Sequence, residues 1–214
     1  MKTVLFDLDG TLLDTLDDLT CAVCYTFEKL GLGKREKAQV RKALGNGVER
    51  LLSDLLGEEN ISYLEEALRI FRPYYRDHSA IQTAPFQGVL EVIDALQKEN
   101  ILCGIVSNKP HEAVVELKKK FFPNVTLAMG EKPNIPRKPS PQPLFEALKE
   151  LGGEKENCLY IGDSEVDIIT AKAANIPCIA MTWGFRDREE LILAGAQHLA
   201  DNAEELYQKI KALL

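Results

Sequence analysis

Residues 3–11 read TVLFDLDGT, a short apolar run that leads directly into two aspartates. The run from Thr3 to Phe6 is apolar or β-branched at each position and shows no polar alternation, which indicates a strand covered on both faces. Asp7 and Asp9 follow without a linker. The sequence therefore predicts a buried first strand that presents acidic side chains at its carboxyl end.

The same arrangement recurs further along the chain. Four more unalternated apolar runs occupy residues 101–106, 125–129, 158–161 and 177–181. Segments with helical periodicity lie between and after them, and one of these has Pro141 near its start and Gly152 after its end, as helices favour. This alternation predicts an α/β fold, with a Rossmann-like three-layer core and a mostly parallel sheet.

The region between the first two strands has helical periodicity only. Leu16, Leu19, Val23 and Phe27 share one helix face, and Thr15 with Asp18 is predicted to cap that helix. We therefore expect an α/β core of residues 1–14 and 86–214, and an inserted helical cap of residues 15–85.

Composition excludes several classes of protein. The 214 residues hold 26 Lys and Arg against 33 Asp and Glu, a net charge of -7 that disfavours nucleic-acid binding. Neither a run of about 18 apolar residues nor an N-terminal secretory signal is present, so we expect no membrane partner. Five cysteines, an odd number, suit free thiols in a reducing cytoplasm. A monomer and a homodimer both remain open.

Cys21 and Cys24 form a C-x-x-C pair, which is found in redox and zinc sites. A zinc site needs two further ligands, and His78, His111 and His198 are isolated in the sequence. We interpret the pair as two small residues on one helix face.

Polar residues gather where the predicted strands end. Asp7 and Asp9 follow the first strand, Ser107 and Asn108 the second, and Asp163 the fourth. Ligands bind outside the carboxyl ends of parallel strands, and converging carboxylates repel each other unless a cation joins them. Mg²⁺ prefers such carboxylates together with phosphate. We therefore predict a Mg²⁺ site for a phosphorylated ligand, built from Asp7, Asp163 and the Asp9 segment.

Each of these motifs also has a plain structural interpretation. The Asp7-x-Asp9 pair could form a turn, Asp163 could cap a helix, and Ser107-Asn108 could begin the next one. Lys138 alone could be a solvated loop lysine. Their combination, in this order and at strand ends, is more specific than any single motif.

The four segments together resemble the haloacid dehalogenase superfamily, whose members include aspartate-nucleophile phosphohydrolases. The matching residues are 7–15 (DLDGTLLDT), Ser107, Lys138 and 162–167 (GDSEVD). Segments 45–47, 107–109, 137–141 and 182–185 are similar to those of its phosphoglycolate phosphatases. Leu13-Asp14-Thr15 stands where many of those enzymes have Val-Asp-Ser, a conservative departure.

The resemblance implies a role for each matching position. Asp7 is expected to be the nucleophile, and Asp9 the general acid and base. Asp7, the Asp9 backbone carbonyl and Asp163 are expected to bind Mg²⁺, with Asp167 as an outer-shell carboxylate. The expected phosphate- and substrate-binding residues are Thr11, Ser107, Asn108 and Lys138, together with Gly45, Asn46 and Gly47 of the cap.

The predicted cap is expected to select the substrate. Backbone N–H groups near Gly45 and Gly47 could bind a small carboxylate, and Arg41 and Arg50 are candidate charge partners. Hinges are expected near Asp14-Thr15 and near Pro85.

The resulting hypothesis is a Mg²⁺-dependent phosphatase of small monoesters, with 2-phosphoglycolate as the first candidate substrate. Another metabolite, pyrophosphate, or a β-phosphoglucomutase-like reaction are alternatives. A receiver-like signalling domain also uses an acidic Mg²⁺ pocket, but the order of the motifs and the helical insertion count against it.

Overall fold

A computed structural model describes all residues, 1–214, and the chain forms two compact units. The α/β unit comprises Met1–Leu13 and Pro85–Leu214, and the helical unit comprises Asp14–Ala84. The chain passes from one unit to the other twice. The short strands β2 (Leu13–Asp14) and β3 (Ala84–Pro85) lie at these two places and pair with each other. The assignment of residues 15–85 as a substrate-selecting cap stays a prediction.

The α/β unit is built on a six-stranded sheet whose paired strands are all parallel. Its order is β5-β4-β1-β6-β7-β8, which confirms the predicted Rossmann-like core. The strands are β1 (Thr3–Phe6), β4 (Leu102–Pro110), β5 (Leu127–Glu131), β6 (Cys158–Gly162), β7 (Cys178–Met181) and β8 (His198–Ala200).

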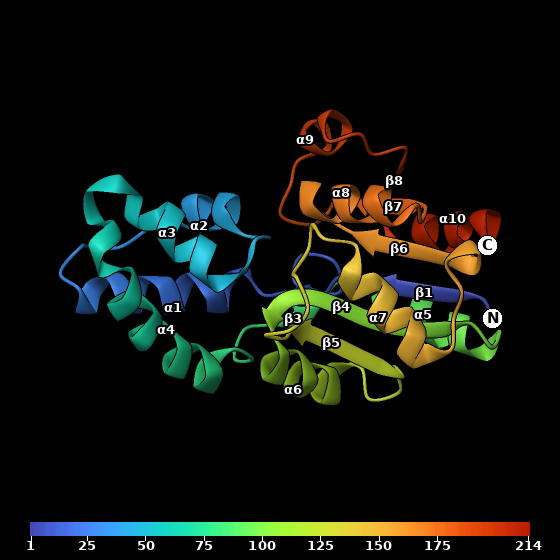
Figure 1. The fold of residues 1–214 in the computed structure, drawn as a ribbon, viewed down its shortest axis with the longest axis horizontal. Coiled ribbons are helices and arrows are strands. Elements are labelled where there is room, and N and C mark those ends of the chain that lie inside the picture. The colour runs from blue at the N-terminus through green and yellow to red at the C-terminus, as the bar shows by residue number, and fades with distance from the viewer. The chain divides into compact units, whose positions relative to one another are not determined.

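Helices cover both faces of this sheet (Figure 1). They are α5 (Val89–Lys98), α6 (His111–Phe121), α7 (Gln142–Leu151), α8 (Glu165–Ala174), α9 (Arg188–Leu193) and α10 (Ala203–Leu213). Helices α7 and α8 contact each other on one side, and α5 contacts α10 on the other. The predicted stop of α7 is confirmed, because Gly152 caps it in the left-handed conformation with φ 67°.

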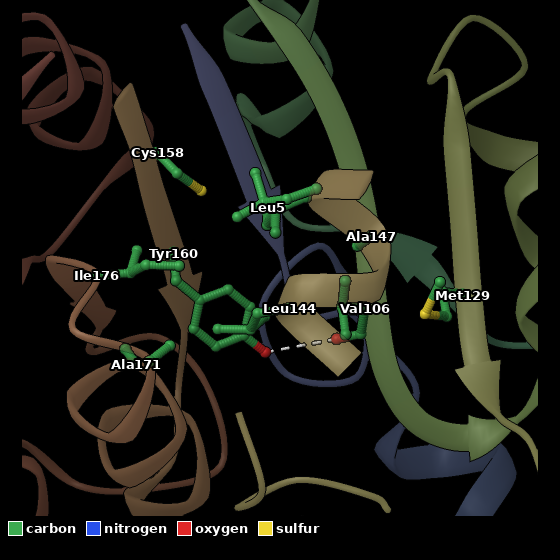
Figure 2. Close-up of a cluster of buried hydrophobic side chains, with 11 residues drawn as sticks. Leu5, Val106, Met129, Leu144, Ala147, Cys158, Tyr160, Ala171 and Ile176 are labelled. Atoms are coloured by element: carbon green, nitrogen blue, oxygen red, sulfur yellow. Dashed lines mark hydrogen bonds between the residues drawn. The ribbon is translucent and has the colours of Figure 1, made fainter. Parts of the chain in front are cut away.

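The core beneath α7 and α8 is apolar and closely packed (Figure 2). Leu5 of β1 and Val106 of β4 face Leu144 of α7, while Tyr160 of β6 lies among them with its ring fully buried. Burial of such side chains stabilises the fold by about 1.5–3 kcal/mol each. Tyr160 differs from the other side chains of this cluster, because its ring is apolar but carries a polar hydroxyl group at its end.

Several small elements are absent from the sequence prediction, β8 and α9 among them. β8 has three residues at the edge of the sheet, and α9 has six residues with only Leu191 buried. Both are too short to show a clear period of apolar residues. The second strand also runs further than predicted, because β4 continues through Ser107, Asn108 and Lys109 to Pro110.

The helical unit contains α1 (Leu16–Lys29), α2 (Lys37–Ala43), α3 (Gly47–Asn60), the 3-10 turn Ile61–Tyr63 and α4 (Leu64–His78). Gly31 follows α1 with φ 71°, as the predicted stop required. None of the helices in either unit is long and apolar enough to cross a membrane.

The predicted cap of α1 by Thr15 is wrong. The Thr15 hydroxyl is buried and makes no hydrogen bond, and Asp18 faces a different segment. Asp18 is buried and accepts from the backbone N–H groups of Ile81, Gln82 and Thr83 and from the Thr83 hydroxyl, at 2.7–3.0 Å. The carboxylate therefore ties the start of α1 to the returning segment.

Replacing Asp18 by asparagine is expected to destabilise the helical unit by about 2 kcal/mol, because an amide N–H₂ would face backbone donors in a buried position. Urea unfolding of both proteins would measure the difference. Asp77→Asn is the matched control, since Asp77 forms an exposed pair with Arg76 and its loss should leave stability almost unchanged. Equal stability of Asp18→Asn and wild type would contradict this role.

Candidate active site

The strand order reverses at β1, which has β4 on one side and β6 on the other. Asp7 follows β1 and Asp163 follows β6, and the Asp7 N–H donates to the Ile161 carbonyl at 2.8 Å. The first and fourth of the strands predicted from the sequence thus lie side by side, as the predicted site of Asp7 and Asp163 requires. The reversal point is where ligands bind in open parallel sheets.

Three buried carboxylates meet at this point. Asp7, Asp163 and Asp167 each offer one oxygen, and these oxygens lie within 4.8 Å of one another. Lys138, whose side chain is 2% exposed, brings its Nζ to 2.9 Å from Asp7 Oδ1 and 2.8 Å from Asp167 Oδ1. The site thus combines three acids with one buried cation, so its negative charge is only partly balanced.

Both carboxylate oxygens of Asp167 accept hydrogen bonds from protein groups. Its Oδ1 accepts from Lys138 and from the Tyr160 hydroxyl, and its Oδ2 accepts from the N–H groups of Asp163 and Ser164 and the Ser164 hydroxyl. Gly162 leaves room for it, because a Cβ there would lie 2.3 Å from the Asp167 side chain. Because both of its oxygens accept hydrogen bonds from the protein, Asp167 is suited to hold neighbouring residues in place rather than to bind a metal ion.

Asp163 is held by the loops around it. Its Oδ1 accepts from the Thr11 hydroxyl at 3.0 Å, and its Oδ2 accepts from the Phe185 N–H at 2.7 Å. A Cβ on Gly10 or Gly184 would stand 2.3 Å from Asp163 side-chain atoms, so both positions need glycine. Thr11, predicted to bind phosphate, here orients Asp163.

Burial and mutual repulsion change the acidity of these groups. Burial, assisted by the negative charge of Asp167 and opposed by Lys138, raises the pKa of Asp7 to about 7. Burial, together with the charges of Asp167 and Asp7, also raises the pKa of Asp163 well above its usual range. Burial alone would raise the pKa of Asp167, but Lys138 and the hydrogen bonds from Ser164 and Tyr160 lower it. Asp7 and Asp163 are therefore the carboxylates whose burial is least compensated, since Lys138 offsets that of Asp7 only in part.

The residues present fit a hard divalent cation. Asp7 Oδ1 is buried and receives no hydrogen bond of good geometry, although Lys138 lies beside it. Oxygen ligands from Asp7 and Asp163 are what Mg²⁺ prefers, and its charge would offset the burial of both carboxylates. Of the predicted metal ligands, these two carboxylates are brought together, whereas the Asp9 carboxylate is not part of this group.

Chelation with EDTA is expected to abolish the phosphatase activity predicted from the sequence, and Mg²⁺ is expected to restore it. Mg²⁺ should also raise the melting temperature of the metal-free protein, because binding at 100 times the dissociation constant stabilises by about 2.7 kcal/mol. Scanning calorimetry with and without Mg²⁺ would measure this shift. Asp163→Asn should remove it, and sodium chloride at equal ionic strength is the control. Full activity in EDTA would contradict the metal site.

Asp9 lies in an ion pair that sequence reasoning missed. Lys109 Nζ donates to both Asp9 carboxylate oxygens, at 2.8 and 3.1 Å, and the Lys109 side chain is 3% exposed. Two residues, 100 positions apart in sequence, thus meet where β1 and β4 lie side by side. Lys109 directly follows Ser107 and Asn108 in the sequence. This position at the end of a predicted strand is the signal that could have marked Lys109 as a site residue.

The end of β4 supports the loop that carries Lys138. Asn108 donates through Nδ2 to the Lys138 carbonyl and accepts through Oδ1 from the Lys138 N–H, each at 2.9 Å. The Ser107 hydroxyl is buried and accepts from the Lys109 N–H at 3.3 Å. Asn108 thus fixes the backbone of Lys138, and its predicted contact with substrate stays a prediction.

The remaining predicted residues belong to the helical unit. Gly45 and Asn46 lie between α2 and α3, Gly47 begins α3, and both glycines have positive φ, 112° and 81°. Arg50 pairs with Asp54 at 2.9 Å on the surface. The predicted contacts of these residues and of Arg41 with substrate stay predictions.

All five cysteines are free thiols. In the Cys21-x-x-Cys24 pair, Cys21 is exposed and Cys24 is half-buried, with its thiol directed to the Arg35 carbonyl at 3.3 Å. Neither cysteine belongs to a cluster that could hold a metal ion.

Comparison with known proteins gives concordant results. A sequence model of the haloacid dehalogenase-like hydrolases matches residues 4–181. Phosphoglycolate phosphatase of Aquifex aeolicus is 32% identical over 191 residues, which cover 86% of this chain and 86% of that protein. Phosphoglycolate phosphatase 1 of Pseudomonas aeruginosa is 32% identical over 216 residues, 96% of this chain and 78% of that protein.

A solved structure extends the similarity to three dimensions. A crystal structure of a Lactobacillus delbrueckii subsp. bulgaricus protein superposes with a TM-score of 0.93 at 36% identity, covering 98% of this chain and 99% of that one. The family match spans both the first acidic segment at Asp7 and the last at Asp163. The chain therefore belongs to the haloacid dehalogenase-like hydrolase family.

Proposed function

We propose that this protein is a Mg²⁺-dependent phosphatase of small phosphate monoesters that works through an aspartyl-phosphate on Asp7. One observation carries the proposal: the buried Asp7 carboxylate lies 2.9 Å from the Lys138 ammonium and beside Asp163 at the reversal point of the sheet. A nucleophile, a cation and a metal-binding acid are the parts that phosphoryl transfer needs.

In the first half-reaction, an oxygen of ionised Asp7 forms a bond to phosphorus, and the bond from phosphorus to the ester oxygen breaks. Asp9 donates its proton to the departing alkoxide, which leaves as a neutral alcohol. Lys138 reduces the repulsion between Asp7 and the dianionic phosphate. The Ser107 hydroxyl binds a phosphoryl oxygen.

In the second half-reaction, the Asp9 carboxylate removes a proton from water, whose oxygen forms a bond to phosphorus. The bond from phosphorus to the Asp7 oxygen breaks, which releases inorganic phosphate and regenerates the Asp7 carboxylate. Lys109 fixes the Asp9 side chain through two hydrogen bonds, so the carboxylate is held in one orientation between the two steps.

Bound Mg²⁺ would supply positive charge against the phosphoryl oxygens, held by Asp7, Asp163 and, as predicted, the Asp9 carbonyl. The net charge of -7 opposes anionic substrates in general, so local cations must attract them. Lys138 and Lys109 are the two buried lysines that contribute.

The substrate that we propose first is 2-phosphoglycolate. Two relatives at 32% identity carry the name phosphoglycolate phosphatase, and this chain matches 86% and 96% of its own length to them. In this proposal the helical unit acts as the cap, and N–H groups near Gly45 and Gly47 bind the substrate carboxylate. The five free cysteines suit a reducing compartment, so we place the enzyme in the cytoplasm.

A substrate panel tests this proposal. The purified protein with Mg²⁺ is expected to release phosphate from 2-phosphoglycolate with a higher kcat/KM than from sugar phosphates or pyrophosphate, and released phosphate is measured directly. A preference for a sugar phosphate would replace the substrate and keep the reaction. Phosphoryl exchange between sugar positions without free phosphate would indicate a mutase, and no turnover of any ester would overturn the proposal.

A further inference from the structure

Tyr160 is a buried polar residue in an otherwise apolar strand. Its relative exposure is 0%, and its ring packs among Val106, Leu144 and Ala171 in the core beneath α7 and α8 (Figure 2). Its hydroxyl reaches out of this cluster to the acidic site, where it lies 2.8 Å from Lys138 Nζ and 2.9 Å from Asp167 Oδ1.

The direction of each hydrogen bond follows from the chemistry of the groups. A lysine ammonium can only donate, so the Tyr160 oxygen must accept from Lys138. The hydroxyl proton then goes to Asp167 Oδ1 at 2.9 Å, since the alternative acceptor, the Val106 carbonyl, is 3.4 Å away. Tyr160 therefore links the ammonium to the carboxylate that balances it.

Three oxygens surround the Lys138 ammonium, which has three protons. They belong to Tyr160, Asp167 and Asp7, at 2.8, 2.8 and 2.9 Å. Two of these contacts come from residues fixed by the fold, because Tyr160 is locked by packing and Asp167 by four other donors. With those two protons engaged, one ammonium proton is left for the ion pair with Asp7, whose Oδ1 lies 2.9 Å from Nζ.

The base of the Lys138 side chain is fixed as well. Asn108 brackets the Lys138 backbone with two hydrogen bonds of 2.9 Å. Asn108 of β4 thus fixes the backbone of Lys138, and Tyr160 of β6 fixes the ammonium at the end of its side chain. A flexible lysine would otherwise lose rotamer entropy each time it is fixed in place.

We propose that Tyr160 is a positioning residue for the phosphoryl transfer described above: its hydroxyl oxygen accepts a hydrogen bond from the Lys138 ammonium and thereby holds that ammonium beside Asp7. The inference rests on the proposed function. Tyr160 itself touches neither substrate nor metal in this proposal, and it acts through Lys138. The sequence gives no sign of this role, because a tyrosine in an apolar strand is usually a packing residue.

Tyr160→Phe tests the proposal with little disturbance of packing, because only the hydroxyl is removed. We expect kcat for the preferred ester to fall 10- to 100-fold and KM to change less than threefold, since the ammonium is misaligned while the other phosphate-binding groups remain. Tyr207→Phe is the matched control: it also removes a hydrogen-bonded tyrosine hydroxyl in the same unit, from the surface of α10, and should leave both constants unchanged.

A double variant separates positioning from general stability. If Tyr160 acts through Lys138, Tyr160→Phe should change the residual rate of Lys138→Met less than twofold. A full additional 10- to 100-fold loss in that background would contradict the proposal. So would a Tyr160→Phe enzyme with wild-type kcat.

A spectroscopic measurement gives a readout independent of turnover. In ¹⁵N-labelled wild type, the Lys138 ammonium should give a protected side-chain signal that exchanges slowly with water, and Tyr160→Phe should lose it. Wild type without activity toward any ester would refute the proposed function, whereas an active wild type with an unaltered Tyr160→Phe variant would refute only the positioning role.

Discussion

Replacing Asp7 by asparagine is expected to lower turnover by roughly 10³-fold or more, because an amide oxygen is a poor nucleophile toward phosphorus. The change is nearly isosteric, and Asp7 sits at the end of β1 with its backbone N–H bonded to the Ile161 carbonyl. The fold should therefore persist. Phosphate release from the preferred ester in Mg²⁺ would measure the loss, and circular dichroism would verify the fold.

The same substitution is expected to stabilise the metal-free protein, and more at pH 8 than at pH 5. Folding raises the pKa of Asp7 from 3.8 to about 7, so between these values the folded chain holds a proton that the unfolded chain has lost. Stability therefore falls as pH rises across this window, and asparagine removes that fall. Melting temperatures in EDTA at both pH values would measure the effect.

Asp94→Asn is the control for both measurements, since Asp94 is exposed on α5. It should keep wild-type turnover and the wild-type dependence of melting temperature on pH. Residual turnover of Asp7→Asn above a few per cent would remove Asp7 from the nucleophile role. Equal melting shifts at pH 5 and pH 8 would contradict the elevated pKa of Asp7 in the metal-free protein.

The architecture of the α/β unit could be predicted because its signals are local. Unalternated apolar runs mark strands buried on both faces, and β1, β4, β6 and β7 all begin within a residue of the predicted positions. The adjacency of Asp7 and Asp163 then follows from the general rule that ligands meet at strand ends. No such pattern exists for β8 or α9, which are short, and β8 also lies at the edge of the sheet.

The partners within the site could not be predicted in the same way, since they depend on side chains that meet only after folding. The Lys109 pair with Asp9 joins residues 100 positions apart, and the Tyr160 hydroxyl joins a core strand to a loop lysine. Thr15 shows the opposite failure: its capping pattern is present, but Asp18 satisfies three backbone N–H groups near Thr83 instead. Hydrogen bonds to a distant segment of the chain thus took the place of the local helix cap that the sequence pattern predicts.

Replacing Lys138 by methionine is expected to reduce turnover to a small residual rate and to lower stability by about 3–5 kcal/mol at pH 8 in EDTA. Lys138 is the cation that faces both Asp7 and Asp167, and it is buried. Without it, Asp167 keeps a negative charge in a low dielectric and Asp7 loses its only adjacent cation. Urea unfolding would measure the stability, and phosphate release the turnover.

Two further variants test whether the effects of Lys138→Met come from the loss of its ion pairs. Lys172→Met removes an exposed lysine from α8 and should change neither quantity by a measurable amount. Asp7→Asn combined with Lys138→Met should recover part of the lost stability, because one of the two buried carboxylates has then been neutralised. If Lys138→Met were as stable as wild type, the ammonium could not be the charge that permits these carboxylates to be buried together, and the assignment of Lys138 as the cation facing the substrate phosphate would fail with it.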